Sequence, residues 1–173
     1  MSTPTVAELD ELGTLLRRVV PAEFEDFNGH VNVRHHYALH MEGAEAAFTD
    51  HFGISQEWID HVGQSSFTVA QHVQFHREIL VGHDVSVHMR ILGTSPKIFH
   101  VLSVLANRTT GEVASTLEYV EAYVDLATRR TTTMPPELAE RIETITARHS
   151  DLPWELPLSG RLGTSRRSAA GEV

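Results

Sequence analysis

The chain has 173 residues with a formal net charge of −9, and its 14 basic residues form no run longer than a pair. This balance argues against a nucleic-acid surface, and the lack of cysteine excludes disulfides, thiolate metal sites and cysteine nucleophiles. No stretch approaches the roughly 18 apolar residues of a membrane span, and the N-terminus lacks signal-peptide features. We therefore expect one cytoplasmic domain that binds neither nucleic acid nor membrane.

The first 18 residues are predicted to form a helical extension. Apolar residues recur at helical spacing over 6–18, with acidic residues early and basic residues late, as the helix dipole favours. Residues 19–24 then predict a short strand that leads into the main domain.

A long helix is predicted over residues 33–52. Apolar side chains recur there every three or four positions, and Gly53 is suited to the C-cap. A shorter helical segment is predicted over 56–61, ending at Gly63.

After residue 64 the apolar pattern changes to period two, which indicates strands. One predicted face of the first strand carries Phe67, Val69, Val73 and Phe75, and the other carries Thr68, His72, Gln74 and His76. Turn signals at 82–84, 93–96 and 107–111 separate three further strands, over 85–91, 98–106 and 113–124. Connections this short make the consecutive strands antiparallel. The pattern predicts an α+β fold in which a curved five-stranded sheet surrounds one long helix.

A last helix is predicted to begin at Pro135-Pro136, with Leu138, Ile142 and Ile145 on one face. Beyond residue 150 the chain is rich in proline, glycine, serine and arginine, which predicts a largely disordered tail over 151–173. The main domain is accordingly expected to span residues 19–150.

Seven residues directly before the predicted long helix include a carboxylate, two carboxamides, an imidazole and a glycine. They are Asp26-Phe27-Asn28-Gly29-His30-Val31-Asn32. A carboxylate in a glycine turn at this place can lie beside free backbone N–H groups and the positive end of the helix dipole. That arrangement suits an anion or a developing oxyanion, and it equally suits an ordinary helix cap.

An Asp-x-x-Gly-His-x-Asn stretch ahead of a helix wrapped by a curved sheet resembles the hotdog-fold acyl-CoA thioesterases of the 4-hydroxybenzoyl-CoA thioesterase type. The resemblance spans residues 19–135. Further stretches resemble the branch associated with carnitine and betaine metabolism: His76-Arg77-Glu78 followed by Gly82, Lys97 with His100, and residues 124–130 leading to Met134-Pro135. The resemblance implies an acyl-CoA substrate with no separate cofactor, and a homodimer or a dimer of dimers (a homotetramer) with sites at subunit interfaces.

The resemblance also assigns residues. Asp26 matches the family's catalytic carboxylate, acting as nucleophile or as general base, and Gly29 and His30 match the turn around it. Asn32 matches the end of the same turn, where it can equally order the backbone. The family's tyrosine corresponds to Tyr37, although the interval before it is one residue longer here. A second oxyanion donor is expected near residues 64–66.

Each of the further substrate-binding candidates also has a purely structural interpretation. Asn28 can touch substrate or order the turn, and Glu42 can serve as a base or be ion-paired. Lys97, the only lysine, can contact a phosphate or a carboxylate of the substrate, or merely begin a strand. His36 and His40 share a helix face, but the glutamate of the zinc-protease pattern is missing, so no metal site is predicted.

Thioester hydrolysis needs only a carboxylate and an oxyanion hole, because a thiol with a pKa of about 8.5 leaves readily as thiolate. The predicted activity is therefore hydrolysis of a small acyl-CoA to the free acid and CoA. The resemblance suggests a betaine-type acyl group, for which the aromatic residues Trp58, Phe67 and Tyr119 are available. Two rival interpretations remain: a hotdog enoyl-thioester hydratase or dehydratase, and a non-catalytic acyl-thioester-binding protein.

Overall fold

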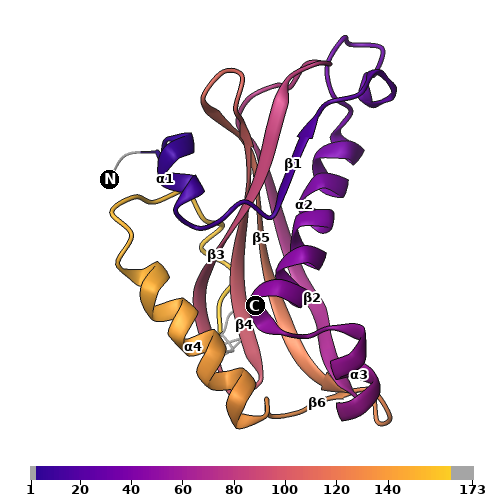
Figure 1. Ribbon diagram of the computed structural model, residues 1–173, viewed down its shortest axis with the longest axis vertical. Helices are drawn as coiled ribbons and strands as arrows, with labels where there is room; N and C mark the ends of the chain where they lie inside the picture. The colour runs from indigo at the N-terminus through magenta and orange to yellow at the C-terminus, as the bar shows by residue number, and fades with distance from the viewer. Residues whose placement is uncertain (1–2, 165–173) are drawn as a thin grey trace, which may run out of the picture.

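The computed structural model describes residues 3–164, in which an antiparallel sheet curves around one long helix (Figure 1). The strand order is β1-β3-β4-β5-β2, and a short β6 pairs with the end of β5. The strands are β1 (Leu16–Val19), β2 (Gln64–Phe75), β3 (Asp84–Ser95), β4 (Ile98–Asn107), β5 (Glu112–Asp125) and β6 (Arg130–Thr131). The predicted α+β architecture and its four long strands are confirmed, with β6 as an addition. The first strand lies at Leu16–Val19 rather than over residues 19–24, because residues 22–24 form the 3-10 helix η1.

The long helix α2 (Val33–Ala47) packs lengthwise against the sheet and continues into a single π-helical turn, η2 (Phe48–Phe52). Gly53 ends this segment with φ +72°, a left-handed conformation that glycine adopts without strain. The shorter α3 (Gln56–Val62) ends in the same way at Gly63, with φ +68°. Both predicted helices and both predicted glycine caps are confirmed.

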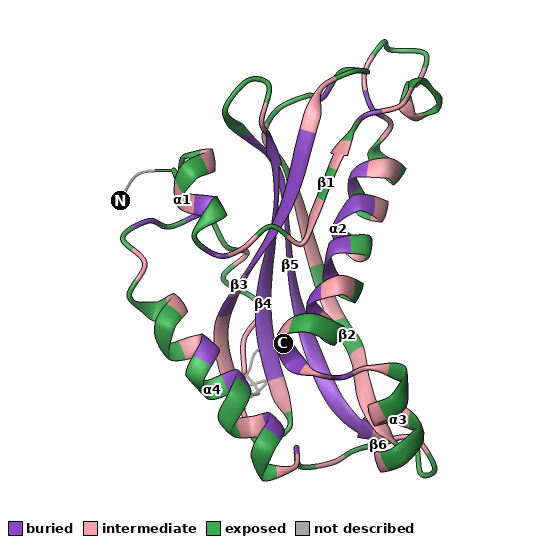
Figure 2. Ribbon diagram, in the orientation of Figure 1, coloured by how far each residue is buried: buried purple, intermediate pink, exposed green. Residues whose placement is uncertain are grey.

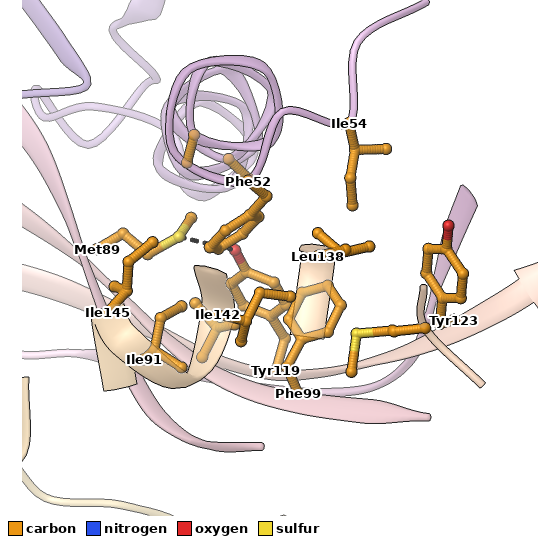
Figure 3. Close-up of a cluster of buried hydrophobic side chains, with 14 of the residues drawn as sticks. Phe52, Ile54, Met89, Ile91, Phe99, Tyr119, Tyr123, Leu138, Ile142 and Ile145 are labelled. Atoms are coloured by element: carbon orange, nitrogen blue, oxygen red, sulfur yellow. Dashed lines mark hydrogen bonds between the residues drawn. The ribbon is translucent and has the colours of Figure 1, made fainter. Parts of the chain in front are cut away.

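The main core lies between the sheet, the end of α2 and helix α4 (Pro136–Ser150) (Figure 3). Leu138, Ile142 and Ile145 of α4 are buried there, as their spacing predicts. Aromatic rings stack edge-on at its centre, with the ring centroids of Phe52 and Phe99 5.4 Å apart. This core anchors the C-terminal end of α2 and leaves its N-terminal end free to carry a site.

The predicted helix over residues 6–18 is wrong beyond residue 10. Helix α1 covers only Val6–Asp10 and begins with a capping box between Thr5 and Glu8. The chain then turns at Gly13 (φ +88°) and becomes β1, which pairs with β3. A bidentate contact from Arg17 to Asp84, at 2.7 Å, accompanies this pairing, so strand pairing outweighs the helical spacing of the leucines.

The predicted faces of the first long strand are wrong on one side of a β-bulge. The register of β2 against β5 shifts between Thr68 and Ala70. Thr68 therefore shares the helix-facing side with Glu121, while Phe67 lies on the opposite face from Val73. A one-residue bulge reverses the alternation, which a period-two pattern cannot reveal.

The far face of the sheet is covered by α1 and by the chain that follows α4 (Figure 2). Trp154 is only 1% exposed, and the Arg90 guanidinium lies 4.6 Å from its ring centroid. Residues 151–164, which we expect from composition to be largely disordered, thus pack against the sheet, because their aromatic and apolar side chains complete a second core. Residues 165–173 of the predicted tail lie outside the described residues.

Helices η1 (Ala22–Phe24), α1 and α3 are short, and no helix in residues 3–164 has the length and apolar character needed to cross a bilayer.

A close approach between α2 and β3 predicts that Gly43→Ala destabilises the protein. A Cβ at Gly43 would collide with the Val87 side chain. The overpacking cost of about 1–3 kcal/mol should exceed the gain of about 1 kcal/mol in helix propensity. Urea unfolding should therefore show a lower free energy of unfolding for this variant. In a Val87→Ala background the penalty should shrink. Unchanged or increased stability of Gly43→Ala would contradict this close packing.

Candidate active site

Residues 26–30 form a closed turn that holds the Asp26 carboxylate. The Asp26 N–H donates to the His30 carbonyl oxygen and the Gly29 N–H donates to the Asp26 carbonyl oxygen, each at 3.0 Å. The Asn28 N–H donates to Asp26 Oδ1 at 2.8 Å. Gly29 has φ +82°, so a side chain there would be strained. The turn therefore fixes one carboxylate oxygen, and no described residue donates a hydrogen bond to the other.

The turn is tied to the body of the domain. The Val31 N–H donates to the Ile79 carbonyl oxygen and the Asn32 N–H donates to that of Phe24, each at 2.8 Å. The His30 Nδ1 lies 3.3 Å from the Val31 carbonyl oxygen, which can only accept, so Nδ1 carries the proton. His30 Nδ1 also lies 3.7 Å from Asp26 Oδ1.

Asn32, not Asp26, caps helix α2. Its Oδ1 accepts from the Arg34 N–H at 3.1 Å, in the usual N-cap geometry. This contact gives Asn32 a structural role at the start of α2, and Asp26 is not the cap of this helix. The Asp26 side chain is 13% exposed, so it is shielded yet still reachable.

The first N–H group of α2 is available to a ligand. Among the hydrogen bonds of the described chain, none is donated by the Val33 N–H. It lies at the positive end of the α2 dipole, a few residues from the turn. The Asp26 turn and an unused helical N–H group thus both lie at the N-terminal end of α2.

A cavity of about 350 Å³, here called the turn cavity, opens at this end of α2. Its walls come from the turn, from the first turns of α2 and from the chain that leaves β2. It is lined by His30, Val31, Val33, His36, Phe75, His76, Arg77 and Glu78. Apart from its apolar side chains and three histidines, the lining has two residues of opposite charge, and one of them, Arg77, is ion-paired with Glu112 at 3.0 Å.

A buried chain of hydrogen bonds runs inward from the turn cavity. His36 Nδ1 lies 3.0 Å from Ser115 Oγ, which lies 3.0 Å from His40 Nε2, and His40 Nδ1 lies 2.8 Å from Ser103 Oγ. Burial lowers the pKa of His36 to about 4 and that of His40 to about 3. Both imidazoles are therefore neutral at pH 7.

This chain has one arrangement in which each hydroxyl proton meets an acceptor. The Ser103 hydroxyl donates to His40 Nδ1, the His40 Nε2–H donates to Ser115, and Ser115 donates to His36 Nδ1. His36 then carries its proton on Nε2. The His36 Nε2 atom has no hydrogen-bond partner in residues 3–164, and it is not one of the fully buried side-chain atoms that lack a partner. It is therefore a neutral donor at the wall of the turn cavity.

These contacts decide the sequence-based interpretation of the histidines. His36 lies at the wall of the turn cavity, whereas His40 is fully buried. In residues 3–164, no group of three or more histidine, aspartate or glutamate residues is placed to hold a metal ion.

The other predicted residues are dispersed. The Tyr37 hydroxyl donates to Gln71 Oε1 at 3.0 Å on the outer side of α2. Glu42 pairs with Arg18 at 2.7 Å, which confirms the plainer interpretation of that glutamate. Lys97 is exposed in the β3–β4 turn, at the opposite end of the sheet from Asp26. Asn28 is exposed within the turn itself.

A second cavity of about 400 Å³, here called the acyl cavity, lies at the C-terminal end of α2. It is lined by Met41, Ala44, Glu45, Phe48, Ile54, Ile59, Ser65, Ser66, Thr68, Tyr119 and Glu121. Ser65 and Ser66, in the segment expected to supply a second oxyanion donor, thus lie at the other end of the helix from Asp26 within one chain. Glu121 was not singled out from the sequence, although two glutamates, Glu118 and Glu121, interrupt an otherwise apolar strand.

A family model described as the thioesterase-like superfamily matches residues 19–142, which is most of the chain. The chain belongs to the thioesterase-like superfamily. This places the Asp26 turn, both cavities and strands β2 to β6 inside the region that the family shares.

Curated relatives of this thioesterase-like protein carry more specific names. The betainyl-CoA thioesterase of Pseudomonas aeruginosa is 28% identical over 145 residues, covering 84% of this chain and 91% of the relative. The L-carnitine dehydrogenase/betainyl-CoA thioesterase of Agrobacterium fabrum is 28% identical over 143 residues, but the match spans only 28% of that longer protein.

The fold agrees with solved structures. A hypothetical protein from Staphylococcus aureus in complex with CoA superposes with a TM-score of 0.74 at 21% identity, covering 81% of this chain and 87% of that one. At this identity the likeness concerns the fold, and it confirms the hotdog architecture.

The two buried histidines predict a pH-dependent stability. Because their pKa values are lowered in the folded state, the unfolded chain takes up protons first, from about pH 6.5 downward. The contribution of the two histidines to the free energy of unfolding is fully present above that pH. It should fall by about 1.4 kcal/mol per pH unit for each histidine as the pH decreases toward 4.

Urea unfolding at several pH values tests this prediction. In His40→Gln the free energy of unfolding should depend on pH less steeply, by about the contribution of one histidine. His61→Gln, at an exposed position on α3, is the matched control. A slope that is identical in His40→Gln and in the unaltered protein would contradict the assignment.

Proposed function

We propose that this protein is an acyl-CoA thioesterase that hydrolyses a small acyl-CoA, of the betainyl-CoA type, to the free acid and CoA. The observation that carries the proposal is the Asp26 carboxylate, held by one oxygen and open at the other, in a turn directly before the helix whose first N–H, that of Val33, is unused. Membership of the superfamily, the names of the relatives and the CoA-bound structural neighbour support the acyl-CoA class.

The geometry suits hydrolysis with Asp26 as the reacting carboxylate. Asp26 either attacks the thioester carbon itself or takes a proton from the water that attacks it. The carbonyl oxygen becomes negatively charged and is stabilised by the Val33 N–H at the dipole's positive end, an effect typically of about 3 kcal/mol per donor. The C–S bond then breaks, and CoA leaves as a thiolate that needs little help from an acid. If Asp26 is the nucleophile, water then hydrolyses the resulting acyl–Asp26 anhydride, which releases the free acid and restores the carboxylate.

His36 is the second donor in this proposal. Its neutral Nε2–H faces the same cavity, and the Ser115–His40–Ser103 chain holds it in the donor tautomer. A neutral imidazole can donate to a developing oxyanion without giving up its proton. The donor expected from the Gln64–Ser66 segment would in that case be supplemented from the long helix itself.

The rival hydratase reaction finds less support. It requires a base that removes a proton from carbon. Burial keeps the pKa of His36 low, and this imidazole presents an N–H to the cavity, so His36 is poorly suited to be that base. A purely binding protein would have no need of a half-free carboxylate in a tightly held turn. Release of thiol from a saturated acyl-CoA separates hydrolysis from both rivals.

Asp26→Asn should lower the rate of thiol release by about 10²–10⁴-fold. The amide oxygen can still accept from the Asn28 N–H, so the melting temperature should stay near that of the unaltered protein. Glu25→Gln, the exposed neighbour, is the control and should retain activity. Near-normal turnover by Asp26→Asn across a panel of acyl-CoAs would refute the role of this carboxylate.

A homodimer formed along β2 is the second part of the proposal. β2 is the last strand of the sheet, and within residues 3–164 no strand pairs with the outer edge of its 12 residues. Such a long edge invites a partner strand. Exposed apolar side chains flank it in the turn, on α2 and on β2: Phe27 (98% exposed), Val33, Tyr37, Val69 and Phe75.

Antiparallel pairing of β2 with a second copy has a consequence for the site. It brings the Phe75 end of one strand beside the Gln64 end of the other. The turn cavity of one copy, which contains Phe75, then adjoins the acyl cavity of its partner, which contains Ser65. The expectation that sites lie at subunit interfaces follows from this pairing, and further assembly into a dimer of dimers stays a prediction.

Val69→Asp, which places a charge in the middle of the proposed interface, should halve the mass seen in sedimentation and abolish thiol release together. Leu158→Asp alters a similarly exposed apolar residue elsewhere and should do neither. A monomeric unaltered protein with full activity at micromolar concentration would contradict the shared site.

A further inference from the structure

The acyl cavity has an unusual balance of charge. Most of its lining is apolar, from Ala44 and Phe48 of the long helix to Ile54 and Ile59 beyond it. Two carboxylates, Glu45 and Glu121, complete it, and no lysine, arginine or histidine is among the lining residues. The cavity is therefore apolar and negative, which disfavours anionic ligands and favours a cation with an apolar surface.

Glu121 lies inside this cavity without a cationic partner. It is 2% exposed, and the hydroxyl of Thr68 donates to its Oε1. No ion pair within residues 3–164 involves it. Burial raises the pKa of Glu121, as expected for a carboxylate that has lost water without gaining a positive charge.

Glu118 shows how the same strand treats a glutamate with a structural role. It is also 2% exposed, but on the opposite face of β5, where His100 Nε2 lies 2.9 Å from its Oε1. The Ser159 N–H donates to its other oxygen at 2.6 Å. Both carboxylate oxygens of Glu118 thus have partners within the protein. Glu121, in contrast, accepts hydrogen bonds only from hydroxyl groups and lies beside an open cavity.

Aromatic side chains complete the site. Phe48 and Tyr119 line the same cavity as Glu121, and the Tyr119 ring is 2% exposed. Aromatic faces attract cations whose charge is spread over methyl groups.

We propose that the acyl cavity binds a quaternary ammonium group through Glu121, Phe48 and Tyr119, and so selects the cationic end of the acyl group. This inference rests on the proposed function and on β2 pairing, because the thioester carbon must reach Asp26 of the neighbouring copy. The ammonium neutralises the buried carboxylate, and its methyl groups contact the apolar wall. The determinant of substrate choice then lies at the opposite end of α2 from the catalytic turn.

A pair of substrates of equal shape tests the charge alone. Betainyl-CoA and tert-butylacetyl-CoA differ in that a carbon atom replaces the quaternary nitrogen. The unaltered protein should prefer betainyl-CoA in kcat/KM by at least about tenfold. Glu121→Gln keeps the shape of the side chain and should reduce this preference to near unity, chiefly by slowing betainyl-CoA hydrolysis.

Glu118→Gln is the matched control, a buried glutamate of the same strand outside the cavity, and it should leave the preference unchanged. Equal turnover of both substrates by the unaltered protein, or an undiminished preference in Glu121→Gln, would overturn the cation site while leaving thioesterase activity in place.

Direct binding separates this inference from the proposed function. Glycine betaine, the product expected of betainyl-CoA hydrolysis, should bind the unaltered dimer saturably in calorimetry and bind Glu121→Gln at least about tenfold more weakly. That result supports the cation site even if no acyl-CoA releases thiol, which would overturn the proposed function alone. Absence of glycine betaine binding to the unaltered protein would overturn the cation site.

Discussion

The packing of α2 inside the curved sheet is the constraint on which the rest of the structure depends. Gly43 lets the helix approach Val87 of β3 closely, and the core around Phe52 anchors its C-terminal end. At the other end, Asn32 caps the helix and leaves the Val33 N–H unused. The position of one helix therefore decides where a free backbone donor lies relative to the Asp26 turn, and where the acyl cavity opens.

The interface between α2 and the sheet is polar where it approaches the site. His36 and His40 replace apolar side chains on the buried face of the helix, and Ser103 and Ser115 receive them on the strands. Burial favours the neutral imidazoles, which gives the turn cavity a donor that needs no charge. The same arrangement ties stability to pH, because the unfolded chain binds the protons that the folded chain excludes.

Much of the architecture could be predicted from periodicity. The long helix with its Gly53 cap, the antiparallel strands and the last helix all follow from apolar spacing and turn residues. The errors lie where a tertiary contact overrides local pattern. Residues 16–18 fit a helix, yet they pair with β3, whose backbone groups need a partner. The bulge after Thr68 reverses the faces of β2, and no residue pattern marks it.

The candidate site was only partly predictable for the same reason. A dense motif reveals Asp26, Gly29 and His30, because the residues that form the turn are adjacent in sequence. Glu121 is brought to Thr68 and Phe48 by strand pairing and helix packing, so its surroundings appear only in three dimensions. Lys97 and Glu42 match expected residue types but lie away from the turn, and Glu42 is held by Arg18.

A crystal structure of the protein with the thioether analogue of betainyl-CoA, which cannot be hydrolysed, would test the central claim most directly. The claim is that one site is built from the two ends of α2 in two copies. The account predicts the carbon beside sulfur within reach of Asp26 and the Val33 N–H of one subunit, and the trimethylammonium group against Glu121 of the other. An analogue whose acyl end lies away from the Asp26 turn, or that is bound wholly within one subunit, would contradict it.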